Sequence, residues 1–167
     1  MKNKPIIRHA NVEDLPSIVD IYNQSIRSGT ATGDMEEFSV EQRLEWFNKF
    51  DFENYPIFVA EEDNSILGYS YISPYRNGRK AMKNIAELSF FVDYLNHGKG
   101  IGSQLISFSI NDCQRIAKHT LVAILLDINK ESISILKKFK FEEWGRIPKS
   151  IDLNGSICDH LIYGLKV

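Results

Sequence analysis

The sequence predicts an α/β (α+β) fold, a mixed and mostly antiparallel central sheet flanked by helices. Hairpin-like strands lie on both sides of a central strand–helix–strand–helix unit, and residues 121–126 form a nearly continuous apolar strand, as expected when both faces of a strand are covered. The chain has 167 residues, of which 43% are hydrophobic, enough for a core without disulfide or metal support. We expect a single domain over residues 1–167.

Short strands and helical patterns alternate in the first half of the chain. Residues 6–8 predict a first strand, and Asn11 or Asp14 can cap a following helix that ends before the loop 28–34. Ser39 and Gln42 form a capping box for a second helix over 39–50. Strands are predicted at 57–61 and 65–72, joined by the polar turn 62–64, with Gly68 as a point of close packing.

The second half contains the strand–helix–strand–helix unit. A strand over 85–92 leads through a glycine-rich loop into a helix that begins near Gly100 and has a broad apolar face. The apolar strand 121–126 and a helix over 129–139 follow. Further strands are predicted to begin at 142–145 and to span 160–165.

Composition and charge exclude several functional classes. The net charge is −2 and no run of Lys or Arg exceeds two residues, so we expect no nucleic-acid partner and no membrane partner. Apolar runs are short and residues 1–5 are polar, which favours a cytoplasmic protein. Cys113 and Cys158 lie far apart without metal-ligand spacing, so we predict buried thiols and no metal site.

The loop over residues 97–103 has the composition of an anion-binding site. Gly98, Gly100 and Gly102 allow tight turns and close approach of a ligand, and the following helix begins with unpaired N–H groups. A pyrophosphate is therefore a natural ligand. Two common nucleotide loops fit poorly, because a P-loop needs Ser or Thr where Gly100 stands and the dinucleotide fingerprint needs glycine where Ser103 stands.

From His97 to Gly102 the loop resembles the acetyl-CoA signature of the GCN5-related N-acetyltransferases (GNAT), Gln/Arg-x-x-Gly-x-Gly/Ala, with His97 at the Gln or Arg position. Other segments resemble the phosphinothricin N-acetyltransferase branch of that superfamily: Ile7-Arg8, Asp14-Leu15-Pro16, Ile21-Tyr22-Asn23, Glu45-Trp46-Phe47, residues 86–92 and Trp144-Gly145-Arg146. The resemblance implies the GNAT fold, acetyl-CoA as co-substrate, a small-molecule amine as acceptor and a possible homodimer.

The resemblance also implies an acetyl-CoA site, residue by residue. The backbone of the strand 90–92 pairs with the pantetheine arm, the loop holds the pyrophosphate, and Asn129 lies against the pantetheine. These residues are Phe90, Phe91, Val92, His97, Gly98, Lys99, Gly100, Ile101, Gly102, Ser103 and Asn129. Because His97 replaces Gln or Arg, Lys99 is left as the main cation. Asn129 also suits a helix N-cap near Ser132, and one of the two phenylalanines must pack in the core.

Glu87 is the candidate catalytic residue. An amine with a pKa of about 10.4 must lose a proton before it attacks a thioester, and Glu87 lies in an otherwise apolar strand where burial raises a carboxyl pKa. It also occupies the position of the general base in phosphinothricin-type enzymes. The alternative is an edge-strand glutamate that faces solvent. Leu136 stands at the usual position of a proton-donating Tyr, so the acid step is unassigned.

For the acceptor, Tyr75 and Arg76 match a substrate arginine of the branch, and an arginine can bind a carboxylate or phosphinate bidentately. The alternative is an ordinary exposed loop arginine. Thr30 and its neighbours are also implied in the acceptor pocket. The sequence therefore predicts an N-acetyltransferase for phosphinothricin- or methionine sulfoximine-type substrates, acting by direct amine attack. Transfer to a polyamine, an antibiotic or a protein N-terminus, and a non-catalytic acetyl-CoA sensor, stay open as alternatives.

Overall fold

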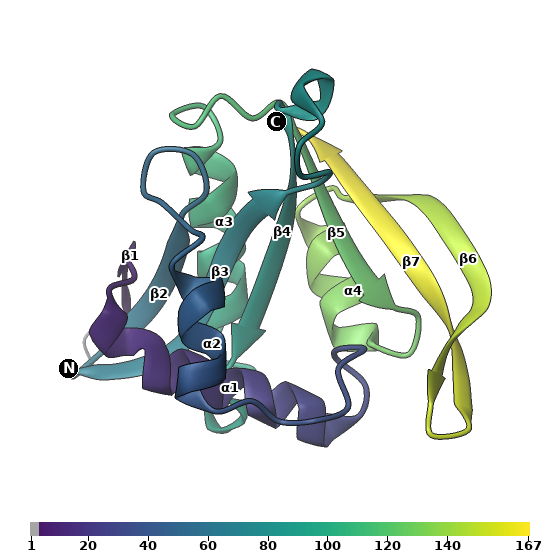
Figure 1. The fold of residues 1–167 in the computed structure, drawn as a ribbon, viewed down its shortest axis with the longest axis horizontal. Helices are drawn as coiled ribbons and strands as arrows, with labels where there is room; N and C mark the ends of the chain where they lie inside the picture. Colours follow the sequence, from purple (N-terminus) through teal and green to yellow (C-terminus); the bar gives the residue numbers. More distant parts are fainter. Residues whose placement is uncertain (1–3) are drawn as a thin grey trace.

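The computed structural model describes residues 4–167 and contains a seven-stranded sheet in the order β1-β2-β3-β4-β5-β7-β6 (Figure 1). Strands β4 and β5 run parallel and all other neighbours are antiparallel, which confirms the predicted mixed sheet. The strands are β1 (Ile6–His9), β2 (Ile57–Glu62), β3 (Ser65–Pro74), β4 (Ile85–Val92), β5 (Thr120–Leu126), β6 (Glu142–Leu153) and β7 (Ser156–Lys166).

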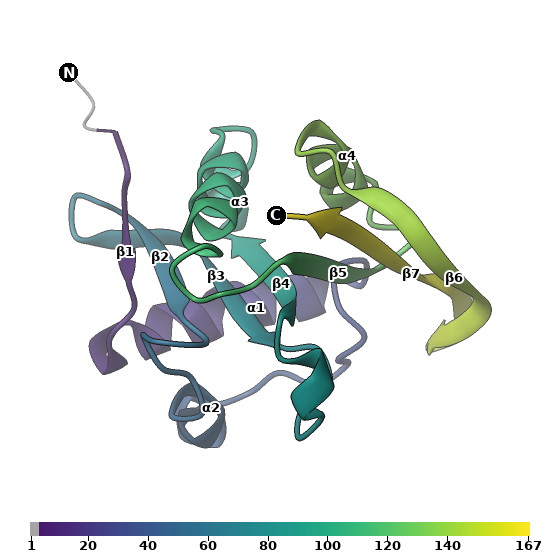
Figure 2. The ribbon, with the colours of Figure 1, turned by 90° about the horizontal axis from the view of Figure 1, so that it is seen from above.

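Helices cover both faces of the sheet. Helices α1 (Leu15–Ser28) and α2 (Val40–Phe47) lie on one face, and α3 (Ile101–Asp112) and α4 (Lys130–Lys138) lie on the other (Figure 2). Each face has its own apolar core. The core on the α1 and α2 side includes Ile18, Val59 and Tyr69, whereas the core on the α3 side includes Phe58, Leu88 and Leu105. Burial on both faces fixes which side chains of β3 and β4 point to each core.

The predicted capping residues lie at the helix starts, but Asp14 does not cap α1 with its side chain. Asn11 caps a short 3-10 helix (Val12–Asp14), while Asp14 pairs with Arg8 at 2.7 Å and makes no side-chain bond to the start of α1. Ser39 and Gln42 form the expected capping box. Helix α2 ends at Phe47 rather than at residue 50, because the chain then tightens into a turn with bonds from Lys49 and Phe50 to carbonyls three residues back.

The β2–β3 hairpin forms as predicted. Asp63 and Asn64 have φ angles of 50° and 61°, as a two-residue type I′ turn requires. Gly68 is a close-packing point, since a Cβ atom there would lie 2.8 Å from the carbonyl oxygen of Phe91. Strands β3 and β4 are thereby drawn together on the side where α3 packs.

Strands β4 and β5 separate along their length. They pair only where residues 85–87 face residues 120–122, ending at the rung that joins Glu87 and Val122. Beyond that rung β4 stays paired with β3, and β5 stays paired with β7. The two strands therefore diverge and a gap opens in the middle of the sheet (Figure 1).

The last two strands are longer than predicted. Strands at 142–145 and 160–165 were expected, but β6 and β7 form one hairpin whose arm projects from the side of the sheet (Figure 1). Pro148 and two register shifts interrupt the alternation of apolar residues in β6, which hides the strand in the sequence. The turn Asn154-Gly155, with φ angles of 54° and 94°, is the signal that marks this hairpin.

Three further observations concern the described part of the chain. Cys113 and Cys158 are both buried free thiols, as predicted. Within residues 4–167, no helix is long and apolar enough to cross a membrane. No group of three or more His, Cys, Asp or Glu side chains in the same range is arranged to hold a metal ion.

Candidate active site

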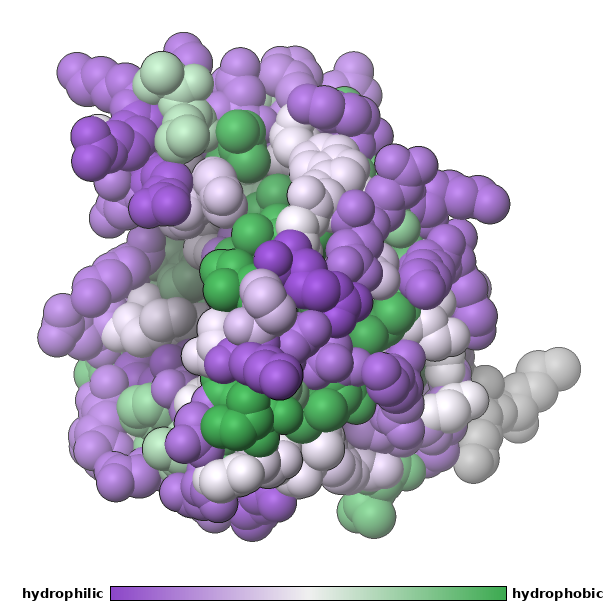
Figure 3. Space-filling model, turned by 90° about the vertical axis from the view of Figure 1, so that its right-hand side faces the viewer, coloured by the Kyte–Doolittle hydropathy of each residue, from purple (hydrophilic) through white to green (hydrophobic). Residues whose placement is uncertain are grey.

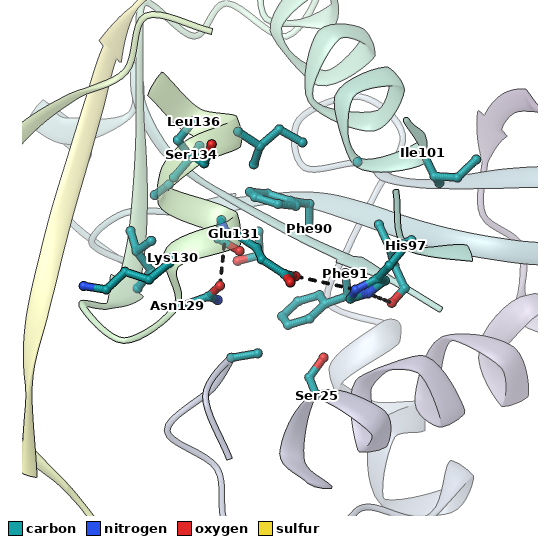
Figure 4. A pocket seen from close by; sticks show the side chains of 18 of the residues that line it. Ser25, Phe90, Phe91, His97, Ile101, Asn129, Lys130, Glu131, Ser134 and Leu136 are labelled. Carbon is teal, nitrogen blue, oxygen red and sulfur yellow. Dashed lines mark hydrogen bonds and ion pairs between the residues drawn. The ribbon is translucent and has the colours of Figure 1, made fainter. Parts of the chain in front are cut away.

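A cavity of about 980 Å³ occupies the gap between β4 and β5. Its walls come from the second half of β4, the facing part of β5, the glycine loop with the first turn of α3, helix α4, and the segment from α1 into the following loop (Figure 4). The lining includes residues 88–92, 96–98, 100–103, 123–125, 128–132 and 134–136, with Ser25, Ser28, Thr30 and Ala31. The separation of two parallel strands thus creates the site.

The glycine loop has the geometry that its sequence predicts. Gly98 and Gly100 have φ angles of 75° and 81°, which L side chains rarely adopt. A Cβ atom on Gly102 would lie 3.1 Å from Cδ1 of Ile135, so this glycine lets α3 approach α4. No side chain caps the start of α3. Its free N–H groups and positive dipole end border the cavity and suit a pyrophosphate.

The two basic residues of the loop differ in position. The Nε2 atom of His97 lies 3.0 Å from the carbonyl oxygen of Val92, so this nitrogen carries a proton, and Nδ1 lies 3.6 Å from the carboxylate of Glu131 (Figure 4). Lys99 instead donates to Oδ1 of Asn96 at 2.8 Å and is absent from the cavity lining. Of these two basic side chains, His97 therefore lines the cavity and Lys99 does not.

Asn129 has the capping role that the sequence suggested. Its side-chain oxygen accepts a hydrogen bond from the backbone N–H of Ser132 at 3.1 Å, which leaves its NH₂ group free to donate into the cavity. Leu136 also lines the cavity and is buried. Helix α4 ends without glycine, and Lys140 adopts the left-handed region with a φ of 66°.

The two phenylalanines of β4 point to opposite faces. Phe90 packs against the core on the α3 side and Phe91 against the core on the α1 and α2 side, and both line the cavity. The expectation that one of them is a core residue was therefore too narrow, because the sheet has a core on each face. Their backbone lies along the open edge of β4.

Glu87 lies at the point where the strands part. It is the last β4 residue paired with β5. Because side chains two or four residues apart in a strand share a face, Glu87 lies on the same side of the sheet as Phe91, the side of α1 and α2. Burial raises the pKa of the Glu87 carboxyl above its usual range. The pKa of Tyr71 is raised by burial and further by the charge of Glu87. The carboxylate is therefore half-buried beside a tyrosine, outside the cavity lining proper.

The expected acceptor residues lie in two places. Thr30 lines the cavity. Tyr75 and Arg76 follow the end of β3, where Pro74 pairs with Ala86, and neither lines the cavity. Arg76 is exposed, with its guanidinium 5.9 Å from the centre of the Tyr75 ring. The structure thus brings Thr30, but not Arg76, to the glycine loop.

Sequence reasoning missed most of the contribution of α4 to this site. Its lining residues include Lys130, Glu131, Ser134 and Ile135, and Ile128 precedes them. A sequence signal for this wall was present. Residues 128, 131, 132 and 135 follow the apolar strand β5 and are spaced three or four residues apart, as on one face of a helix. That spacing gives one helix face, which here forms a wall of the cavity (Figure 4).

The separated parallel strands, the glycine loop and the uncapped start of α3 together define an N-acetyltransferase. The family model described as "Acetyltransferase (GNAT) domain" matches residues 7–162. The chain belongs to the GNAT acetyltransferase family.

Individual relatives agree with this assignment. The chain is 33% identical over 158 residues to YwnH of Bacillus subtilis, provisionally named a phosphinothricin acetyltransferase, covering 95% of this chain and 96% of YwnH. It is 31% identical to an L-methionine sulfoximine/L-methionine sulfone acetyltransferase of Pseudomonas aeruginosa, covering 86% and 83% of the two chains. A crystal structure of a phosphinothricin acetyltransferase from Sinorhizobium meliloti in complex with acetyl-CoA superposes with a TM-score of 0.92 at 26% identity, covering 99% and 89%.

Proposed function

We propose that residues 1–167 act as a single catalytic domain that transfers an acetyl group from acetyl-CoA to the amino group of a small amino-acid-like molecule, of the phosphinothricin or methionine sulfoximine type. The observation that carries this proposal is the position of Glu87 at the last rung before the cavity opens. At this rung Glu87 lies beside a cavity whose border includes the glycine loop and the start of α3, which suit an anion. The names of the relatives support the acceptor class.

The proposed cofactor site uses the residues implied by the resemblance, since all of them except Lys99 line the cavity. The free edge of β4 from residue 90 to 92 offers backbone groups to the pantetheine amides. The first turn of α3 offers N–H groups to the pyrophosphate. The NH₂ group of Asn129 is a further donor on the opposite wall.

In the proposed reaction Glu87 acts as the general base. The acceptor ammonium gives its proton to Glu87, the neutral nitrogen forms a C–N bond with the thioester carbonyl carbon, and the C–S bond breaks as CoA leaves with the electron pair. The attacking nitrogen loses its second proton to water as the adduct collapses to the amide. A pKa raised by burial makes the Glu87 carboxylate a better proton acceptor. Backbone N–H groups near Phe91 stabilise the negative charge on the carbonyl oxygen.

Release of the thiolate needs no protein acid in this scheme. Leu136 cannot donate a proton. A thiol pKa of about 8.5 makes the thiolate a tolerable leaving group, which water protonates. Both cysteines are buried, so an acyl-enzyme route through either of them is disfavoured and the amine attacks directly.

The experiment is an assay of free thiol release from acetyl-CoA with a panel of amines. The panel contains phosphinothricin, methionine sulfoximine, methionine sulfone, spermidine, an aminoglycoside and a peptide with a free N-terminus. We expect activity with the first three. Activity confined to spermidine, the aminoglycoside or the peptide would overturn the acceptor class. If the protein binds acetyl-CoA but acetylates no amine of the panel, the enzyme hypothesis is wrong and a non-catalytic acetyl-CoA sensor is the better interpretation.

We also propose a homodimer that uses the β6–β7 hairpin. Seen from that side, apolar side chains gather among polar ones (Figure 3). The exposed large apolar residues of this hairpin are Trp144, Ile147 and Ile157, and β6 is an edge strand, which is prone to pair with another chain. Light scattering should give about twice the mass of one chain. The double substitution of Ile147 and Ile157 by Lys should give the mass of one chain.

A further inference from the structure

Arg43 is a partly buried arginine without an acidic partner. Within residues 4–167, Arg8, Arg27, Arg115 and Arg146 each form an ion pair, whereas Arg43, Arg76 and Arg79 form none. Arg76 and Arg79 are exposed, so water solvates them. Arg43 is not exposed, and its Nε atom is buried without any hydrogen-bond partner. A buried donor left unpaired destabilises the folded protein.

Aromatic rings hold this guanidinium in place. Its central carbon lies 3.9 Å from the centre of the Trp46 ring, 4.9 Å from that of Tyr22 and 5.1 Å from that of Phe38. Each such contact is attractive, and together they fix the side chain without neutralising its charge. The terminal nitrogens of Arg43 also make no hydrogen bond to residues 4–167 but are not sealed from solvent. A fixed, unneutralised cation is left available to an anion.

The cage around Arg43 adjoins the proposed active site. The Tyr22 ring that contacts Arg43 also packs edge-on against Phe91, which lines the cavity, at 5.0 Å between ring centres. Trp46 packs against Tyr71 at 5.3 Å. The pKa of Tyr71 is raised mainly by burial. The charge of Glu87 raises it further, and the charge of Arg43 lowers it. Arg43 and the proposed base therefore act on the same aromatic residue.

A second unpaired polar atom lies in the same cluster. The hydroxyl of Tyr69 is fully buried and has no hydrogen-bond partner, and its ring stacks on those of Tyr71 and Phe91. These two side chains, Arg43 and Tyr69, are the ones in residues 4–167 with buried side-chain atoms that lack a partner. Native proteins keep few such atoms, and two of them on one side of β3 and β4 mark this cluster as a candidate functional feature.

We propose that Arg43 is a specificity-determining residue that binds the carboxylate of the acceptor while the acceptor's amino group faces Glu87. This inference rests on the proposed function and adds to it the residue that recognises the acceptor's carboxylate, Arg43 on α2. The guanidinium offers two parallel N–H donors to a carboxylate, which a lysine cannot do. The aromatic rings of the cage provide the contact surface for the rest of the molecule.

The test compares L-methionine sulfone with its carboxamide, which lacks the negative charge. Binding is measured by calorimetry on protein saturated with CoA, so that no turnover is needed, and thiol release is measured in parallel with acetyl-CoA. We expect the natural protein to bind the carboxylate at least 10-fold more tightly. Arg43→Met should abolish this preference by weakening carboxylate binding while the carboxamide changes less than 3-fold. Arg43→Lys should restore only part of the preference.

Lys49→Met, which removes an exposed cation next to α2, is the control and should leave the preference intact. If the natural protein binds carboxylate and carboxamide alike, or neither, or if Arg43→Met weakens both equally, the inference is wrong. If Arg43→Met does not fold, Arg43→Lys decides the question: a reduced carboxylate preference in Arg43→Lys, with Lys49→Met unchanged, supports the inference, and an unchanged preference overturns it. Absence of thiol release with every amine is the separate failure of the proposed function.

Discussion

Glu87 pairs with Val122 at the last rung that joins β4 to β5, and the cavity begins one residue further along both strands. One carboxylate thus marks the boundary between the closed sheet and the open site. Its neighbours on β4 supply the cavity wall, while its own side chain faces the other side of the sheet with Tyr71. We propose that acetyl-CoA lies in the cavity and that the acceptor amine reaches its thioester carbonyl from the face of the sheet on which Glu87 lies.

Ionisation of Glu87 should destabilise the folded protein as the pH rises. Burial raises its pKa above the unfolded value of about 4.3. The folded state therefore holds this proton more tightly, and the resulting stability is complete below the unfolded pKa and is lost as the pH rises through the folded pKa. We expect Glu87→Gln to melt at a higher temperature than the natural protein at pH 8 and at nearly the same temperature at pH 4. A lower melting temperature at pH 8 would contradict the assignment of a buried carboxylate.

Gly68 should tolerate no side chain. In Gly68→Ala the new Cβ would lie 2.8 Å from the carbonyl oxygen of Phe91 and 3.2 Å from side chains of α3. We expect a loss of about 1–3 kcal/mol in the free energy of unfolding, measured by urea denaturation, because the core is overpacked. Gly145→Ala is the matched control in another strand, where the nearest atoms are at 3.7 Å, and should change stability by less than about 0.5 kcal/mol. Equal effects in both variants would refute the close approach.

Lys140→Gly should stabilise the protein. Lys140 lies just after the end of α4 with a φ of 66°, a region that costs an ordinary L residue about 1–2 kcal/mol. Glycine removes this cost but adds chain entropy to the unfolded state, so a net gain of about 0.5–1 kcal/mol is expected. Thermal denaturation measures it. Lys137→Gly, inside the helix, should instead destabilise by about 1 kcal/mol, and a gain there would show that the helix end is not the cause.

Arg76→Ala should act on acceptor binding alone if Arg76 binds the substrate. The side chain is exposed and forms no ion pair within residues 4–167, so its removal should leave the melting temperature unchanged. We expect KM for methionine sulfone to rise about 10-fold, the value of a charge-assisted hydrogen bond, with kcat nearly constant. Lys80→Ala serves as a control in the same loop. An unchanged KM would show that Arg76 does not bind the acceptor and is an ordinary exposed loop residue.

The sequence was sufficient for most elements because their signals are local. The capping box of Ser39, the Asn129 cap and the type I′ turn at Asp63 are each set by residues within a few positions of one another. The length of the β6–β7 hairpin was not predicted, because its register depends on bulges and long-range pairing. Arg43 was missed for the same reason, since Trp46 lies on its own helix but Tyr22 and Phe38 do not.

The divergence of β4 and β5 also has no local signal. Two sequence features lie near this divergence. Glu87 is the last residue of β4 that pairs with β5, and the glycines of the loop 97–103 shape one end of the cavity. The sequence therefore predicted the loop and the base separately. Their relation through a gap in the sheet required the structure.

The most direct measurement compares Glu87→Gln with the natural protein in acetyl-CoA binding and in acetyl transfer to the best amine of the panel. We predict a fall in kcat/KM of about 10²- to 10⁴-fold, as expected for loss of a general base, with a Kd for acetyl-CoA that changes less than 2-fold. Glu62→Gln, at the end of β2, should match the natural protein in both. Full transfer activity in Glu87→Gln would contradict the account.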